Sequence, residues 1–498
     1  MPDNDRPTVA LALADLAAWA AAVSWPDLPE DIQKRAALVL LDDFAAMVAA
    51  RDEPELIALR DGVARSAGPA EATVFDGGHH RLDRYSAALS NGTAADWCEL
   101  DGGYRPAVCH AALYCLPALM AEAEATGASL RDLLLALVVG YETVARFARA
   151  FVLPRLVLHP HGGIATIGAA AAVAKLRGQS AALMRDTIAT AATLVLPGPF
   201  GHAVAGALVR NTWPGLCAQN GLRAADWAAI GIAGTPDSAN DVFVAIFGAT
   251  AHAAALSSGL GQDWAMRDGY HKMHACCQYG HSTVEAVLAA LGDGGKIGAG
   301  EIAAIRVETH EKGQVLDNEA PATTLAAKFS IQHIAAATAV FGHAGAAAFH
   351  ADTLGDPDLA KLRQRVTIAP FQPRMDPPND RPARVTLSLR DGRMLAGECL
   401  SAQGGPDRPF TEGQIKAKAE MILRGVYPDA LGLLAAAGRL DPRFLTGAGA
   451  GSSKISAESA VGAQHLPPFR NSKLQTTENT NTGSPLSRPS IGHVGNEK

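Results

Sequence analysis

The chain has 498 residues, of which 48% are hydrophobic, and its formal net charge at pH 7 is -7. This length predicts two to three domains, and the modest acidic charge without Lys/Arg runs excludes the basic footprint of a nucleic-acid-binding protein. No apolar stretch is long and charge-free enough to span a bilayer, so no membrane partner is expected. The N-terminus lacks the basic region of a signal peptide, and the 7 cysteines have no regular spacing. We therefore expect a cytoplasmic protein.

Apolar residues recur at helical spacing through the first half of the chain. The pattern is clearest at residues 11–23, 35–50, 130–151 and 163–178. Several of these segments are apolar nearly all round, which predicts helices buried inside a bundle. Their many alanines allow helices to approach closely. We predict one all-helical domain over residues 1–267.

Strand and helix patterns alternate in the next part of the chain. The runs are strands at 301–310, 364–371 and 383–400, and helices at 281–291 and 330–349. The segment 383–400 holds two β-rich runs joined at Asp391-Gly392, which is a strong hairpin pattern. We predict a smaller α+β domain over residues 268–402.

Helical patterns return at 413–426 and 428–440, and we expect these helices to pack back onto the first domain. The expected fold class is therefore mainly α, with the large helical domain built from residues 1–267 and 403–445. Residues 446–498 are polar, rich in Gly, Ser, Thr and Pro, and without periodicity, so we predict a disordered tail there.

Several common motifs are missing from the sequence. There is no G-x-S-x-G elbow, no P-loop and no well-placed G-x-G-x-x-G. The Gly-rich run at 292–300 precedes a strand, whereas a phosphate-binding loop precedes a helix. Nucleotide, flavin and serine-hydrolase chemistry lose most of their support.

The first candidate cluster lies within residues 91–110 and combines acids, a base and an arginine around Gly102-Gly103. Its members are Asp96, Glu99, Asp101, Arg105 and His110. A Gly-bearing loop of this composition fits an active-site wall, and it fits a solvated loop with a capping histidine equally well.

Two further clusters precede or begin helical runs. His159-Pro160-His161-Gly162 comes before an alanine-rich helix, where an anion site is conceivable, although the pattern alone favours a capped helix start. Arg210 lies between apolar helical runs. Because an unpaired buried arginine is costly, it needs a carboxylate partner, from the substrate or from the chain itself.

The fourth cluster, residues 270–281, lies at the predicted domain junction. Its reactive residues are His271, Lys272, His274, Cys276, Cys277 and His281. Zinc prefers His and Cys ligands, but no C-x-x-C pair is present, so we expect no metal. Domain junctions favour ligand pockets, and a lysine there can bind a carboxylate or act as a base. A fifth segment, 327–334, predicts a helix that begins near Ser330.

Together and in this order, the clusters resemble the MmgE/PrpD family over residues 8–445. The matching segments are N-G-T-A-A in the first cluster, H-P-x-G before G-A-A-A-A, N-G-L-R-A-A after Arg210, Lys-x4-Cys-x3-His at Lys272, and K-F-S at 328. The family includes 2-methylcitrate dehydratase, cis-aconitate decarboxylase and iminodisuccinate epimerase. The resemblance implies an all-α domain with an inserted α+β lid, a homodimer, a pocket between the domains, and no metal or organic cofactor.

The resemblance also carries over site residues, with departures. His110, His159 and Lys272 match family residues, Asp101 matches an acid, and Glu99 stands where aspartate is usual. Arg210 replaces a common lysine, Gly103 falls where decarboxylase members have threonine, and His333 falls where a tyrosine is frequent. The resulting site hypothesis has catalytic residues His110, Lys272, His159, Glu99 and Asp101, and substrate-binding residues Arg210, His333, Arg105 and Gly103.

The reactions of such a family share a carbanion or enolate-like centre beside a carboxylate. We hypothesise a cofactor-independent lyase that dehydrates or decarboxylates a small di- or tricarboxylate, with Lys272 and His110 as the proton-transfer pair and either one as the base. Arg210 and His159 would bind substrate carboxylates. An epimerase (isomerase) of a small dicarboxylate is the alternative, and a non-catalytic acid-binding protein is the third hypothesis.

Overall fold

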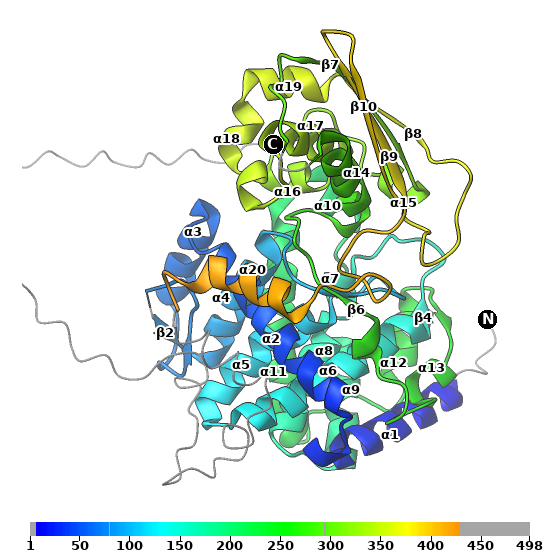
Figure 1. Cartoon of the computed structure of the whole chain (residues 1–498). Helices are drawn as coiled ribbons and strands as arrows, with labels where there is room; N and C mark the ends of the chain where they lie inside the picture. The colour runs from blue at the N-terminus through cyan, green and yellow to red at the C-terminus, as the bar shows by residue number, and fades with distance from the viewer. Residues whose placement is uncertain (1–5, 79, 293–294, 428–498) are drawn as a thin grey trace, which may run out of the picture. The chain divides into compact units, whose positions relative to one another are not determined.

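The computed structural model describes residues 6–78, 80–292 and 295–427. These residues are mainly helical (Figure 1), and they belong to one compact unit of the chain. Among them, no helix has both the length and the apolar character needed to cross a membrane. The helix predicted at 428–440 and the tail predicted at 446–498 lie outside the described residues.

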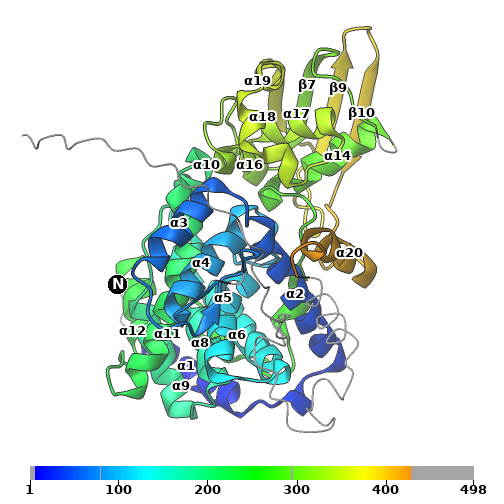
Figure 2. The ribbon, with the colours of Figure 1, turned by 90° about the vertical axis from the view of Figure 1, so that its left-hand side faces the viewer.

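The helices predicted at 11–23, 35–50, 130–151 and 163–178 are confirmed. They belong to a larger set of helices, most of which contribute to one hydrophobic core. They are α1 (Arg6–Ala22), α2 (Glu30–Ala49), α3 (Pro54–Ala64), α4 (Arg84–Trp97), α5 (Ala111–Thr126), α6 (Leu130–Ala150), α7 (Pro160–Gly163), α8 (Ala165–Leu176), α9 (Ala181–Thr193), α10 (Gly201–Ala205), α11 (Trp213–Ala229), α12 (Ser238–Asn240) and α13 (Ala254–Ser257). The late helix α20 (Glu412–Leu423) packs beside α2 (Figures 1 and 2), and its Ala419 and Leu423 join the same core.

Small residues let several of these helices approach closely, as the alanine-rich sequence predicts. Gly92 of α4 faces Gly215 of α11, and a Cβ at position 92 would lie only 2.6 Å from the Gly215 Cα. In α6, a Cβ at Gly140 would lie 2.7 Å from the Ala172 Cβ of α8. Because close-packed interiors have no spare volume, these positions require glycine.

A second hydrophobic cluster surrounds a four-stranded sheet with strand order β10-β9-β7-β8. Its strands are β7 (Ile302–Thr309), β8 (Val366–Pro370), β9 (Ala383–Leu389) and β10 (Met394–Cys399). Strand β9 pairs antiparallel with both β7 and β10, and β8 pairs parallel with β7. The predicted hairpin turn at Asp391-Gly392 is confirmed, with Gly392 at φ 89°, a left-handed conformation that favours glycine.

Helices α14 (His281–Leu291) and α17 (Ile331–Phe341) pack against this sheet, as predicted. The expected start of α17 is confirmed, since the Ser330 side chain caps it by accepting from the His333 backbone N–H. Shorter helices complete this part: α15 (Glu311–Gln314), α16 (Thr324–Lys328), α18 (Ala351–Gly355) and α19 (Pro357–Arg363). The division of the chain into two domains stays a prediction.

The structure also contains short strand pairs that the prediction of an all-helical first domain lacks. They are β1 (Ala72–Thr73) with β2 (Arg81–Leu82), β3 (Gly103–Tyr104) with β6 (Gly269–Tyr270), and β4 (Phe151–Val152) with β5 (Thr250–Ala251). Strands of two residues are too short to show a period-two pattern. The β3–β6 pair matters most, because it joins the loop after α4 to the segment that carries Lys272.

The contact between Gly92 and Gly215 gives a test of the packing. We expect Gly92→Ala to lower the free energy of unfolding by about 1–3 kcal/mol, because the new methyl group meets backbone atoms that cannot move independently. Urea denaturation measures the free energy of unfolding of both variants. Gly355→Ala is the control, since no neighbouring atom lies within 4 Å of a Cβ at that helical position. Equal stability of both variants would contradict this account.

Candidate active site

The loop between α4 and α5 carries two buried carboxylates, Glu99 and Asp101. Both side chains are almost completely inaccessible to solvent, at 1% and 0% exposure, so the loop is not a solvated one. Glu99 adopts φ 52°, a left-handed conformation that non-glycine residues rarely adopt and that concentrates at functional sites. The strained backbone directs the Glu99 carboxylate between two cations.

Glu99 lies between Arg210 and Lys272. Arg210 Nη1 donates to Glu99 Oε1 at 2.6 Å and to both Asp96 oxygens at 2.7 and 2.8 Å. Lys272 Nζ donates to Glu99 Oε2 at 3.0 Å. Burial alone would favour a neutral Glu99, but Arg210 and Lys272 outweigh it and hold the pKa of this carboxyl well below its usual range. The partners that Arg210 needs are therefore internal carboxylates.

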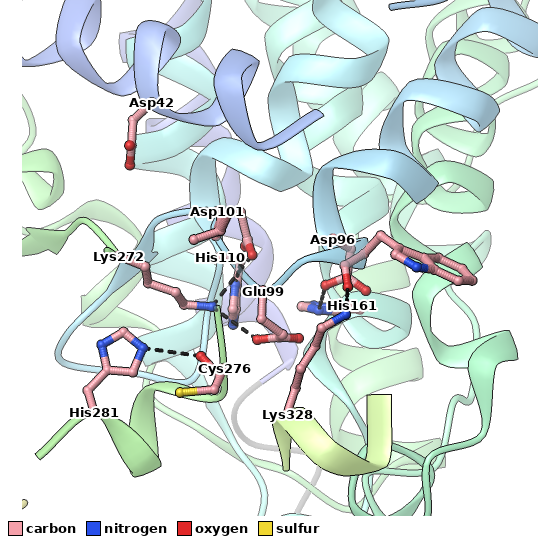
Figure 3. A network of polar contacts seen from close by, with 12 residues as sticks. Asp42, Asp96, Glu99, Asp101, His110, His161, Lys272, Cys276, His281 and Lys328 are labelled. Atoms are coloured by element: carbon pink, nitrogen blue, oxygen red, sulfur yellow. Dashed lines mark hydrogen bonds and ion pairs between the residues drawn. The ribbon is translucent and has the colours of Figure 1, made fainter. Parts of the chain in front are cut away.

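Lys272 and His110 meet at Asp101 (Figure 3). Lys272 Nζ lies 3.5 Å from Asp101 Oδ1, and the His110 Nδ1 lies 2.5 Å from Asp101 Oδ2. Burial disfavours the charged amine, but Asp101 and Glu99 raise the pKa of Lys272 well above its usual value, so the amine is an ammonium. When the His110 Nδ1–H donates to Asp101, its Nε2 is left as an acceptor.

His159 has two roles in the structure. It stands at the N-cap of α7, where its Nδ1 lies 3.2 Å from the His161 backbone N–H, so the helix-cap prediction is confirmed. Its Nε2 lies 3.3 Å from Arg210 Nε. Burial, helped by the Arg210 charge, lowers the pKa of His159 well below its usual value, so the ring is neutral. A neutral imidazole carries no charge and accepts at one nitrogen only, so it can accept from the His161 N–H or from the Arg210 Nε–H, but not from both.

His161 extends the network on the other side of Arg210. Its Nε2 lies 2.8 Å from Asp96 Oδ1, and its Nδ1 lies 2.8 Å from the Tyr114 hydroxyl. A continuous series of polar contacts therefore runs from Tyr114 through Asp96 and Arg210 to Glu99. Its members are all buried, which fixes their positions relative to one another.

The network faces a small cavity of about 40 Å³, here called the polar pocket. Of the predicted site residues, Glu99, His110, His159 and Arg210 line it. Its other lining residues are Tyr104, Ala107, Val108, Cys109, Phe200, Tyr270, Cys277, Gln278, Tyr279, Phe329 and Arg381. Lys272 and Asp101 are not among these residues, and they act on the pocket through their contacts with Glu99 and His110.

The structure does not bring His333 or Arg105 to this pocket, which corrects both predictions. His333 is buried, with its Nε2 3.0 Å from the Ala348 carbonyl and its Nδ1 3.3 Å from Arg363. Its position on α17 turns the ring away, and Phe329 lines the pocket instead. Arg105 forms an ion pair with Asp380, so its charge is already balanced.

Gly103 does not line the pocket either, but its small size shapes the wall. A Cβ at this position would overlap the phenol of Tyr270, which does line the pocket. Tyr270 thus places a hydroxyl group where a side chain at position 103 would otherwise lie. Burial raises the pKa of Tyr270, so the phenol keeps its proton.

Sequence reasoning missed Tyr270 and Arg381 as pocket residues. Arg381 comes from the loop before β9, with its guanidinium 5.2 Å from the Tyr279 ring centre, and its Nε is 3.9 Å from Asp380. It is 8% exposed. Nothing in its local pattern distinguishes it from other arginines. Tyr270 could have been found, because it begins the fourth cluster and adjoins the Lys272 segment.

The histidines and cysteines of residues 270–281 have several different contacts: Cys277 lines the polar pocket, and the His271 Nδ1 lies 2.8 Å from Asp42 Oδ2. The His281 Nε2 donates to the Cys276 carbonyl at 3.1 Å, and burial raises the pKa of the Cys276 and Cys277 thiols. Within residues 6–78, 80–292 and 295–427, no group of three or more His, Cys, Asp or Glu residues could hold a metal ion.

Comparison with known proteins identifies related sequences. Over 440 residues, the chain is 26% identical to the cis-aconitate decarboxylase-like protein oryM of Aspergillus oryzae, covering 83% of this chain and 90% of that protein. The cis-aconitate decarboxylase of Aspergillus terreus is 28% identical over 55% of this chain and 59% of its own length. The Homo sapiens cis-aconitate decarboxylase is 25% identical over 70% of this chain and 74% of its own length.

Two family models match consecutive parts of the chain. The MmgE/PrpD N-terminal domain matches residues 14–243, and the MmgE/PrpD C-terminal domain matches residues 274–440. The first match contains the α4–α5 loop and Arg210, and Lys272 falls just before the second. The chain therefore belongs to the MmgE/PrpD family.

Proposed function

We propose that this protein is a lyase that moves a proton at a carbon beside a carboxylate of a small di- or tricarboxylate. The observation that carries the proposal is that His110, which contacts the buried Asp101 carboxylate, lines the same polar pocket as the cation Arg210. A carboxylate that orients an imidazole is a recurrent way to prepare a general base. The relatives named cis-aconitate decarboxylase support the substrate class.

His110 is the group that we assign as the base. Asp101 accepts a hydrogen bond from the His110 Nδ1–H, so the Nε2 can take a proton. Lys272 is unsuited to this role, because Glu99 and Asp101 keep it as an ammonium. Its charge instead stabilises the carboxylates next to His110 and the negative charge that develops on the substrate.

Arg210 and Arg381 are the cations that line the polar pocket and can receive substrate carboxylates. The Arg210 Nη1 contacts Asp96 and Glu99, and its Nε contacts His159, so Nη2 is the donor that we assign to the substrate. Arg381 has only a distant carboxylate partner, Asp380 at 3.9 Å, among the described residues. We therefore assign the main carboxylate contact to Arg381.

In dehydration, His110 would take the proton from the carbon beside a carboxylate, and the hydroxyl group would leave as water with a proton from an acid. Tyr270 can be this acid, since its phenol is protonated and lines the pocket. In decarboxylation, a carboxylate leaves as carbon dioxide and the same carbon accepts a proton. Both reactions need the negative charge on that carbon to be stabilised by nearby cations.

An epimerase that exchanges the same proton without loss of water or carbon dioxide is the second candidate. A third is a protein that binds a small acid and does no chemistry. NMR of candidate acids such as cis-aconitate in deuterated water separates the three: loss of water or carbon dioxide supports the lyase, deuterium uptake alone supports the epimerase, and binding without exchange supports the third.

We also propose the finer organisation that the family resemblance implies. The helices of residues 1–267 and 403–445 would form one domain, with residues 268–402 as an inserted lid, in a cytoplasmic homodimer without a cofactor. The packing of α20 beside α2 supports the two-ended helical domain. Analytical ultracentrifugation would test the dimer.

Replacing the assigned base, His110, or the neighbouring ammonium, Lys272, should lower turnover strongly while binding persists. We expect His110→Gln and Lys272→Met each to lower kcat by about 100-fold or more, measured by NMR on the substrate identified above. Lys418→Met is the matched control, because Lys418 is also a buried lysine paired with a buried carboxylate, Asp42 at 2.6 Å. It should lose stability but retain most of the turnover; near-normal kcat in both site variants would refute the assignment.

Two arginine variants test which cation binds the substrate. Arg381→Met should raise KM about 10- to 100-fold, as expected for the loss of a charge-assisted hydrogen bond, with a smaller effect on kcat. Arg105→Met should change KM only slightly, because Arg105 pairs with Asp380 outside the polar pocket. If steady-state kinetics showed a larger rise in KM for Arg105→Met than for Arg381→Met, the result would support the sequence-based prediction that Arg105 binds the substrate.

The Tyr270 hydroxyl can be tested by its removal. Tyr270→Phe should lower kcat about 10- to 100-fold, because one donor to the developing charge is lost. The control is Tyr141→Phe, whose hydroxyl donates to the Gly103 carbonyl at 3.3 Å and does not line the polar pocket. Equal kcat values for the two variants would exclude a role for Tyr270 in the chemical step.

A further inference from the structure

A second, much larger cavity adjoins the polar pocket. It has a volume of about 760 Å³, and its wall is mostly apolar. Large apolar side chains that line it are Phe151, Leu156, Leu158, Phe243 and Phe247. Three charged residues are among its lining residues: Arg149, Glu311 and Lys312. We call it the outer cavity.

The outer cavity and the polar pocket share part of their walls. Ala107, Val108, Phe200 and Tyr279 line both. Ala107 and Val108 come from the same loop as His110, and the Phe200 ring stacks on His159 at 5.3 Å between ring centres. A ligand held by the polar pocket therefore lies next to the outer cavity.

The sizes of the two spaces restrict what the ligand can be. The polar pocket, at about 40 Å³, has room for only a few water molecules, because each water needs about 10–15 Å³ of such volume. A di- or tricarboxylate must extend beyond it, toward the outer cavity. A compact polar acid would leave most of that apolar wall in contact with water, which costs free energy in proportion to the area.

The apolar wall is also open to solvent at some positions. Val152 and Leu156, which both line it, are 46% and 42% exposed. Exposed apolar side chains gathered at a concave site next to polar groups are characteristic of a ligand-binding site. The Lys312 amine, 5.8 Å from the Tyr279 ring centre, adds a positive charge at this wall.

We propose that the substrate is a di- or tricarboxylic acid with an apolar substituent, an alkyl or aryl group of several carbons, which lies in the outer cavity. The inference rests on the proposed function, because it places the carboxylates in the polar pocket. The polar pocket would position the reacting carbon, and the outer cavity would select the substituent. Each buried methylene should raise affinity about fourfold.

Binding measurements test the inference without any turnover. The probes are succinate and its 2-methyl, 2-butyl and 2-hexyl derivatives, titrated into the full chain by calorimetry. We expect affinity to rise about fourfold per added methylene, with a negative heat-capacity change. Constant or falling affinity along the series would overturn the proposal.

A charged substitution in the outer wall gives the second test. Leu156→Glu should lower the ratio of 2-hexylsuccinate affinity to succinate affinity at least tenfold. The reason is that the new carboxylate at position 156 must stay hydrated, and its water disfavours an apolar substituent at this wall. Leu11→Glu is the matched control, because Leu11 is an exposed leucine, at 69% exposure, on α1 and lines neither cavity. The ratio should be unchanged in this control; an equal fall in both variants would overturn the inference.

The same cavity could instead receive a second copy of the chain. Analytical ultracentrifugation of Leu156→Glu distinguishes this outcome. If this variant dissociates an oligomer, and affinity does not depend on the length of the alkyl substituent, the outer cavity is an interface between copies of the chain and our proposal is wrong.

Failure of the inference and failure of the proposed function give different results. Deuterium exchange on short polycarboxylates without any gain from longer substituents would overturn only the inference. Affinity that rises with chain length, but no exchange with any acid that binds, would overturn only the proposed function.

Discussion

The candidate site depends on the placement of Glu99 between Arg210 and Lys272. Each of these three groups is almost fully buried, and an isolated buried charge is too costly to persist. The charges therefore require one another, and they come from three distant parts of the chain. The left-handed backbone at Glu99 stores local strain that these ion pairs offset. The pairing thus connects the stability of the fold to the geometry of the site.

The close-packed helices supply the rigid frame that this pairing needs. Glycine contacts such as Gly92 against Gly215 leave α4 and α11 no freedom to shift. The end of α4 is also held from the sheet-containing part of the chain, because Lys328 Nζ donates to the Trp97 carbonyl at 2.7 Å. The loop that begins there carries Glu99, Asp101 and His110, so rigid neighbours position these three side chains.

Much of the fold could be predicted from the sequence, because it rests on local patterns. Helical spacing identified α2 and α6, alanine content indicated close helix contacts, and Asp391-Gly392 located the β9–β10 hairpin. Several candidate site residues were predicted in the same way, since His110 and Lys272 stand in clusters of unusual composition. The two-residue strands escaped prediction, because they are formed by pairing with distant segments and have no period of their own.

The sequence by itself indicated most of the charged groups of the candidate site, although not Arg381, and, through family motifs, the class of chemistry to consider. Only the tertiary structure decided how the groups are used. It paired Arg210 with Asp96 and Glu99, which local sequence could not do because partners more than 100 residues apart are matched by packing. It also moved His333 away from the pocket and brought Arg381 and Tyr270 to it. Side-chain direction depends on the packing of whole elements, so residue identity alone does not specify it.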